Sequence, residues 1–253
     1  NDTATTEIYT RSIVGSRQMC IRDRLAGCLG EGEADIFHGD DIAPPVPVDD
    51  FVLMDENGHY YSFSQLEGKV IVIAFLFTRC PDICPIVSAN LDFISEELGD
   101  RYGTEVAILS ITVDPWADNS SILSAYAEQR GLDWPHLTTS NASDISDLED
   151  VWRNFGVGLD VYNSDEDSDG VADGFDTCSG TPEGESVDDK GCGLETQQSD
   201  GGVKIMHHPL TYWVDHTTGT IIVDKQMRQR VWWGDTDWNA EMVLEDIYLL
   251  LEE

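Results

Sequence analysis

The sequence predicts an α/β fold in which helices cover a central sheet. Two continuous apolar runs, at 70–77 and 106–113, are typical of strands that are buried on both faces. Segments that favour a helix follow each run, and a hairpin and a final helix complete the chain. This alternation of strands and helices is the order found in layered α/β domains.

The other strands are predicted at the two ends of this pattern. Residues 51–63 alternate between apolar and polar side chains around Asn57-Gly58, a pair that favours a tight β-hairpin. A short turn over 64–69 leads into the first buried strand. Two further strands are expected at 210–214 and 220–223.

Four helices are predicted from apolar spacing and from their boundaries. The first helix opens at the cysteine motif, and its apolar positions are Ile86, Leu91, Ile94 and Leu98. The second helix covers 121–130 and stops at Gly131, the third covers 148–155, and the last runs from about 238 to 251.

The chain divides into regions of different character. Residues 1–24 show no periodicity and resemble translated sequencing adapters, so they are excluded from the fold. Residues 25–48 contain Leu25-Ala26-Gly27-Cys28, which resembles a lipoprotein signal-peptide box, followed by an acidic, proline-containing tether. The folded domain is expected over 49–253, with an acidic insertion at 160–202.

Net charge restricts the possible partners. The chain has 49 acidic residues against 14 Lys and Arg, a formal net charge of −35. Such a surface repels phosphate backbones and anionic headgroups, which excludes nucleic acid and argues against direct docking on anionic lipids. No apolar run approaches the roughly 18 residues that span a bilayer.

Cys80 and Cys84 form the pair that carries the predicted chemistry. They follow a buried strand and open a helix, and residues four apart lie on one face of a helical turn. A helix N-terminus lowers the pKa of a thiol and favours the thiolate. Two thiolates can bind a soft metal such as Cu(I) or exchange with a disulfide, and this spacing alone leaves both possibilities open.

The centre of the insertion carries aspartates at regular spacing. Carboxylates at alternate positions, with a glycine for the sharp turn, suit a hard cation that takes six to eight oxygens, although a solvated acidic loop would look similar. The pattern resembles thrombospondin type 3 repeats, which implies calcium binding and a disulfide between Cys178 and Cys192. The predicted calcium ligands are Asp165, Asp167, Asp169, Asp173 and Asp176.

The stretch Phe77-Thr78-Arg79-Cys80-Pro81-Asp82-Ile83-Cys84-Pro85 and several flanking segments resemble the Sco/SenC family of copper chaperones. The flanking matches are 68–70, 90–91, 110–115, 126–127, 134–138 and 155–157. The resemblance implies a thioredoxin-like three-layer fold with a central mixed sheet, an N-terminal hairpin and the acidic loop as an insertion. It also implies a copper site formed by both cysteines and one distant histidine.

The resemblance places that histidine five residues before a tyrosine. Counting back from Tyr212 gives His207, and its neighbour His208 is the second candidate. Two thiolates and one imidazole suit Cu(I), and the same set can hold Cu(II). Structural zinc would need a fourth ligand that the sequence does not offer.

Two functional hypotheses follow. In the first, the protein is a metallochaperone, anchored by a lipid at Cys28 on the extracytoplasmic side, periplasmic or at the cell surface. It would deliver copper to the binuclear copper centre of cytochrome c oxidase, with the copper-bearing oxidase subunit or another copper or thiol protein as partner. In the second, it is a thiol–disulfide oxidoreductase that works through the Cys80/Cys84 dithiol. A third interpretation makes the insertion a calcium-dependent docking module.

Overall fold

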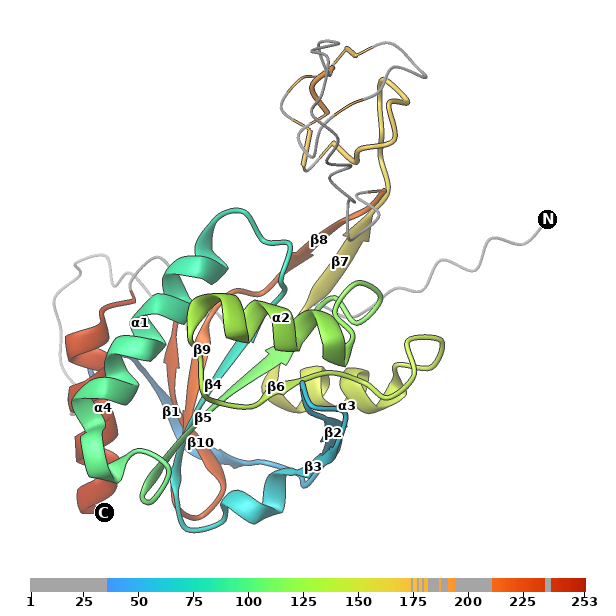
Figure 1. Cartoon of the computed structure of the whole chain (residues 1–253). Helices are drawn as coiled ribbons and strands as arrows, with labels where there is room; N and C mark the ends of the chain where they lie inside the picture. The colour runs from blue at the N-terminus through green and yellow to red at the C-terminus, as the bar shows by residue number, and fades with distance from the viewer. Residues whose placement is uncertain are drawn as a thin grey trace, which may run out of the picture.

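The centre of the molecule is a six-stranded mixed sheet with strand order β1-β10-β9-β4-β5-β6 (Figure 1). The computed structural model describes residues 36–173, 175, 176, 178, 180, 181, 187, 191–193, 211–234 and 238–253. Strands β4, β5 and β6 are parallel, whereas β1, β10, β9 and β4 pair antiparallel in turn. The strands are β1 (Asp40–Pro47), β4 (Val70–Leu76), β5 (Val106–Thr112), β6 (His136–Leu137), β9 (Thr220–Val223) and β10 (Arg228–Trp233).

The two continuous apolar runs form the middle of this sheet, as predicted. Every residue of β4 and β5 is buried, and the strands pair from Val70 with Val106 to Leu76 with Thr112. Because side chains alternate along a strand, Val72 points into one hydrophobic core and Ile73 into the other. A strand buried on both faces needs apolar residues at successive positions, which explains the unbroken runs.

Helices and a hairpin cover the two faces, which gives three layers. Helices α1 (Ile83–Leu98) and α4 (Ala240–Glu252) lie side by side on one face. The other face is covered by α3 (Ser146–Phe155), the hairpin of β2 (Val52–Met54) and β3 (Tyr60–Ser62), and the 3-10 turn Phe63–Leu66. Helix α2 (Ser120–Arg130) packs beside β6, and a second 3-10 turn covers Gly99–Arg101.

Local signals located the hairpin turn and the C-terminal end of α2. Met54 pairs with Tyr60 across a turn in which Gly58 has a φ of 79°, a conformation that favours glycine. The side chain of Asn119 accepts the first free amide of α2, from Ile122, and Gly131 ends the helix with a φ of 70°.

One predicted core position on α1 is wrong. Ile86 is 53% exposed, whereas Val87 is buried. The buried stripe includes Cys84, Val87 and Leu91, at intervals of three and four residues, and Ile86 lies outside it.

Part of the predicted tether is strand β1, which the sequence did not reveal. Asp40 pairs with Trp232 and Asp41 with Val231 of β10. The buried carboxylate of Asp246 on α4 accepts the backbone N–H groups of His38 at 2.8 Å and Gly39 at 3.0 Å. Proline and charge are tolerated at a sheet edge, so the composition resembles that of a linker although the segment pairs with the sheet.

The acidic insertion leaves the domain through a two-stranded ribbon. Strand β7 (Leu159–Tyr162) pairs antiparallel with β8 (Trp213–His216), and Leu159 lies opposite His216. Figure 1 shows the ribbon projecting from the body with the acidic segment at its end. The insertion was predicted to begin at 160, but residues 160–162 belong to β7. Among the residues that the structure describes, no helix is long and apolar enough to cross a membrane.

Candidate functional site

The two cysteines lie where β4 passes into α1. A short loop separates Cys80 from the strand, and the backbone N–H of Cys80 donates a hydrogen bond to the carbonyl of Phe77. Cys84 occupies the first turn of the helix. Cys84 is buried, with 3% of its surface exposed, and Cys80 is partly buried against the same core. Both are thiols rather than a disulfide in this structure.

The surroundings of Cys80 favour its thiolate. The Cys84 thiol donates a hydrogen bond to the Cys80 sulfur, and this contact is the main reason why the pKa of Cys80 falls to about 6. Burial opposes the shift, while backbone N–H groups of Cys84, Asp82 and Ile83 add to it. These amides belong to the start of α1, whose first N–H groups have no partner within the helix. At neutral pH the thiolate of Cys80 is therefore favoured, and the sulfur of Cys84 lies next to it.

A buried ion pair holds the loop that carries Cys80. The guanidinium of Arg79 donates from Nε at 2.9 Å and from Nη2 at 2.6 Å to Oδ2 of Asp114, which follows β5. The two side chains are only 3% and 0% exposed. Tyr212 donates its hydroxyl to the other oxygen of Asp114 at 2.6 Å. Segments that follow β4 and β5 and precede β8 are thus fastened together beside the cysteines.

A second buried carboxylate supports the same loop. Asp118 accepts hydrogen bonds from the amide and hydroxyl of Thr78 and from the hydroxyl of Thr112 at 2.7 Å. Burial, together with the nearby charge of Asp114, raises the pKa of Asp118 to about 7 although these hydrogen bonds oppose the shift. The sequence analysis did not single out Asp114 or Asp118. The signal for them was their position, because carboxyl ends of neighbouring parallel strands meet at one edge of the sheet.

The predicted histidine ligands, His207 and His208, lie outside the described residues, as does the predicted lipidation site, Cys28. The described part of the chain resumes at Thr211. The ring of the next residue, Tyr212, stacks on the guanidinium of Arg79 in the cysteine loop, and its hydroxyl donates to Asp114.

The other histidines near the sheet are packing residues. His136 is fully buried and packs edge-on against the rings of Trp134 and Tyr126, and burial lowers its pKa to about 4. His216 packs edge-on against Phe77, with ring centroids 5.7 Å apart, and burial lowers its pKa as well.

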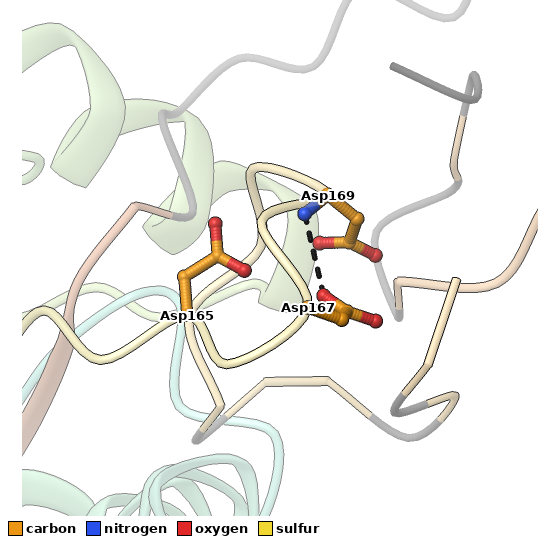
Figure 2. Close-up of side chains that lie close together, drawn as sticks. All are labelled: Asp165, Asp167 and Asp169. Atoms are coloured by element: carbon orange, nitrogen blue, oxygen red, sulfur yellow. Dashed lines mark hydrogen bonds between the residues drawn. The ribbon is translucent and has the colours of Figure 1, made fainter. Parts of the chain in front are cut away.

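Three of the five predicted calcium ligands come together in the acidic segment (Figure 2). One carboxylate oxygen from each of Asp165, Asp167 and Asp169 lies within 4.8 Å of the others. Oδ1 of Asp165 and Oδ2 of Asp169 are inaccessible to solvent and have no hydrogen-bond partner. Asp167 instead accepts the amides of Gly180 and Thr181, both at 2.7 Å.

The other two predicted ligands are placed differently. Oδ1 of Asp173 accepts the amide of Glu166 at 2.9 Å, and Oδ1 of Asp176 accepts the amide of Cys178 at 2.7 Å. Asp176 and Asp169 both approach the backbone of Gly191, where a Cβ would lie 2.1 Å and 3.0 Å from their carboxylate oxygens. Only a glycine fits at this point.

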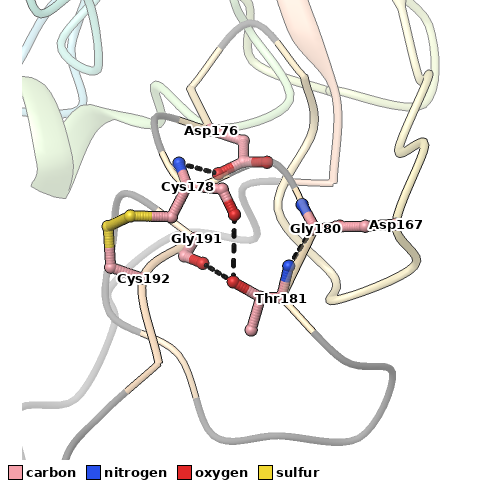
Figure 3. Close-up of a disulfide and its surroundings, with 7 residues drawn as sticks. All are labelled: Asp167, Asp176, Cys178, Gly180, Thr181, Gly191 and Cys192. Carbon is pink, nitrogen blue, oxygen red and sulfur yellow. Dashed lines mark hydrogen bonds between the residues drawn. A yellow bond between two sulfur atoms is a disulfide. The ribbon is translucent and has the colours of Figure 1, made fainter.

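The predicted disulfide between Cys178 and Cys192 is present (Figure 3). Their Cα atoms are 5.0 Å apart, within the usual range for a disulfide. The hydroxyl of Thr181 lies between the two halves of the loop and donates to the carbonyls of Gly191 at 2.6 Å and Cys178 at 3.0 Å. A disulfide and side chain–backbone bonds thus hold together the two halves of this loop.

A mixed central sheet between helices, with a dithiol at the N-terminus of the helix after β4, defines a thioredoxin-like protein. Residues 41–174 match the SCO1/SenC family model, and the chain belongs to this family.

Known proteins similar to this chain agree with that assignment. An SCO2-like protein of Rickettsia conorii is 32% identical over 118 residues, which cover 47% of this chain and 56% of the relative. The chain thus spans about half the length of the curated relatives that it matches. The solution structure of apo Sco1 from Thermus thermophilus superimposes with a TM-score of 0.58 at 24% identity, over 87% of this chain and 99% of that one. A copper-bound structure of Arabidopsis thaliana ScoI gives 0.57 at 18% identity, over 82% and 99% of the two chains. The likeness to these two structures supports the fold.

Proposed function

We propose that this protein binds one copper ion through Cys80, Cys84 and His207 and delivers it to the binuclear copper centre of cytochrome c oxidase. The observation that carries the proposal is the dithiol at the start of α1, with a Cys80 pKa near 6. A thiolate is the form that binds a soft metal, and it is already favoured here at neutral pH. The copper-bound structure of the Arabidopsis relative supports the same cargo.

The contact of Tyr212 supports a histidine as the third ligand. The ring of Tyr212 lies 4.3 Å from the guanidinium carbon of Arg79, the residue before Cys80. His207 is five positions before Tyr212, and an extended chain of that length reaches at most about 18 Å. This short connection supports His207 as a ligand beside the two sulfurs, and the same argument applies to His208, which is one residue nearer to Tyr212.

Two thiolates and one imidazole give a three-coordinate site that suits Cu(I) and leaves room for an incoming ligand. Transfer would proceed by ligand exchange, in which thiolates of the recipient replace those of this protein one at a time. The copper-bearing oxidase subunit is the proposed recipient.

Anaerobic Cu(I) titration against a competing chelator tests the proposal, with X-ray absorption to count sulfur and nitrogen neighbours. We expect two sulfurs and one nitrogen in the wild type, and a loss of the nitrogen with much weaker binding in His207→Ala. His208→Ala is the matched control and should retain wild-type affinity. Unchanged affinity in His207→Ala together with a loss in His208→Ala would transfer the role to His208. Unchanged affinity in both variants would refute the proposal that one of these histidines is a copper ligand.

The lowered pKa of Cys80 also favours a second function, thiol–disulfide oxidoreductase, because thiolates are the attacking species in disulfide exchange. Exchange needs the two sulfurs but no histidine. His207→Ala should therefore spare exchange with a small disulfide, whereas Cys80→Ser should abolish it. If Cys80→Ser retained the exchange rate, this second function would be wrong.

We also propose calcium binding in the acidic segment, with Asp165, Asp167 and Asp169 as the central ligands. The two carboxylate oxygens without a partner are the supporting observation, since buried polar atoms normally have one. Isothermal titration calorimetry with calcium is the test, and Asp169→Asn should weaken binding. The absence of binding heat in the wild type would contradict the site. A docking role of this segment would depend on the same calcium, so chelation should abolish partner binding and leave the copper site intact.

The protein is further proposed to be an extracytoplasmic lipoprotein, anchored to the membrane through Cys28. The disulfide between Cys178 and Cys192 supports an oxidising compartment, where such bonds persist. Metabolic labelling with a radioactive fatty acid should mark the wild type but not Cys28→Ser. Equal labelling of both would refute the anchor.

A further inference from the structure

The guanidinium of Arg79 lies between two aromatic rings. Its central carbon is 4.3 Å from the ring centroid of Tyr212 and 5.1 Å from that of Phe175. Its N–H groups bond to Asp114, and the side chain is only 3% exposed. The two rings therefore cover a charge that would otherwise face water at this edge of the sheet.

The second of these rings comes from the acidic insertion. Phe175 stands in the part of the insertion between two of the predicted calcium ligands, and its amide bonds to the carbonyl of Ala172 at 2.8 Å. It also packs on Trp213 of β8, with ring centroids 4.6 Å apart and planes at 69°. Val171 and Ala172, just before it, are each 1% exposed. The insertion thus touches the body of the protein at the cysteine loop.

We propose that Phe175 is a positioning residue for the Cys80/Cys84 site. The ring excludes water from the guanidinium, and the ion pair between Arg79 and Asp114 becomes stronger as its surroundings become less polar. Arg79 is bonded through the backbone to Cys80, so its fixed side chain fixes the loop that presents the sulfur. The insertion then helps to position the two cysteines and is more than an extension of the domain. The predicted effect on copper binding rests on the proposed function, whereas the predicted effect on the thiols does not.

The test compares three variants, which differ in whether the aromatic ring is kept and in where the substitution lies. Phe175→Leu removes the aromatic face but keeps an apolar side chain, and Phe175→Tyr restores the face. Tyr162→Leu is the control, since Tyr162 is an exposed aromatic residue on β7 of the same ribbon. Phe175 is only partly buried, so these variants should fold, and urea denaturation would verify that each of them still unfolds in one cooperative transition.

Two measurements report on the Cys80/Cys84 site directly. The first is the Cu(I) dissociation constant, which should rise in Phe175→Leu by at most about tenfold, the limit reached when a whole desolvated cation–π contact acts on the site. The second is the equilibrium of the dithiol with glutathione, in which one glutathione disulfide is reduced to two thiols as the bond between Cys80 and Cys84 forms. Its constant should change in Phe175→Leu and return to the wild-type value in Phe175→Tyr. Tyr162→Leu should change neither quantity.

The outcomes separate the two proposals. If the wild type binds no copper, the proposed function fails, and the glutathione equilibrium still decides the role of Phe175. If Phe175→Leu matches the wild type in that equilibrium, and in copper affinity where copper binds, Phe175 does not position the site. Equal effects of Phe175→Leu and Tyr162→Leu would also overturn the inference, because they would indicate a general effect on the ribbon.

Discussion

Replacing Arg79 by methionine should destabilise the protein strongly. The side chains of Arg79 and Asp114 are 3% and 0% exposed and are joined by hydrogen bonds of 2.6 Å and 2.9 Å. Methionine fills much of the space of arginine but leaves the carboxylate of Asp114 buried without its cation. Breaking a buried pair in this way costs about 3–5 kcal/mol, most of which is the penalty for the charge left behind.

Urea denaturation, followed by tryptophan fluorescence, measures the loss. With a slope of about 2–3 kcal/mol per molar urea, the midpoint should fall by about 1–2 M. The matched control is Arg153→Met, because Arg153 pairs with Asp150 at 2.5 Å but both side chains are more than 70% exposed. An exposed helix pair contributes about 0.3–0.5 kcal/mol, so this control should barely move the midpoint. A loss below about 1 kcal/mol in Arg79→Met, or one equal to that in Arg153→Met, would refute the reasoning.

Three other predictions concern titration and metal binding. The pKa of Asp118 is about 7 in the folded protein against 3.8 ordinarily, so the folded state holds a proton that the unfolded chain loses. The free energy of unfolding should therefore decrease as pH rises from about 4 to 7, by up to about 4 kcal/mol, and Asp118→Asn should remove this dependence in denaturant titrations. A slope that is the same in both proteins would contradict the assignment. Alkylation of Cys80 by iodoacetamide should be half-maximal near pH 6, and Cys84→Ala should move that midpoint to higher pH because it removes the main hydrogen-bond donor. A midpoint near the ordinary 9.0 in the wild type would show that the thiolate is not favoured. Calcium should protect the segment from 165 to 192 against proteolysis, and Asp167→Asn should reduce the protection; equal cleavage with calcium and with a chelator would count against the site.

Local sequence patterns were sufficient for the elements whose conformation is set by their own residues. The apolar runs at 70–77 and 106–113 are the buried strands β4 and β5, and Asn57-Gly58 forms the hairpin turn. The end of α2 at Gly131 follows from the preference of glycine for the position after a helix. The disulfide between Cys178 and Cys192 followed from the resemblance to calcium repeats.

Strand β1 shows where such patterns fail. Its composition resembles that of a linker, and it forms a strand because β10 offers an edge and Asp246 accepts two of the preceding amides. Ile86 shows a smaller failure, since helical spacing alone does not say which of two adjacent apolar residues faces the sheet.

From the sequence alone came the layered class, the cysteine pair at a helix start and the acidic segment with its bridged cysteines. The class follows from the order of strands and helices, each of which leaves a visible pattern in a short stretch of chain, and the pairing of the two cysteines was implied by a family resemblance. Only the tertiary structure revealed how Arg79 meets Asp114 and how Tyr212 and Phe175 enclose it. Asp114 lies 35 residues from Arg79 and 98 from Tyr212. Such contacts depend on which strands become neighbours in the sheet, and no local pattern encodes that choice.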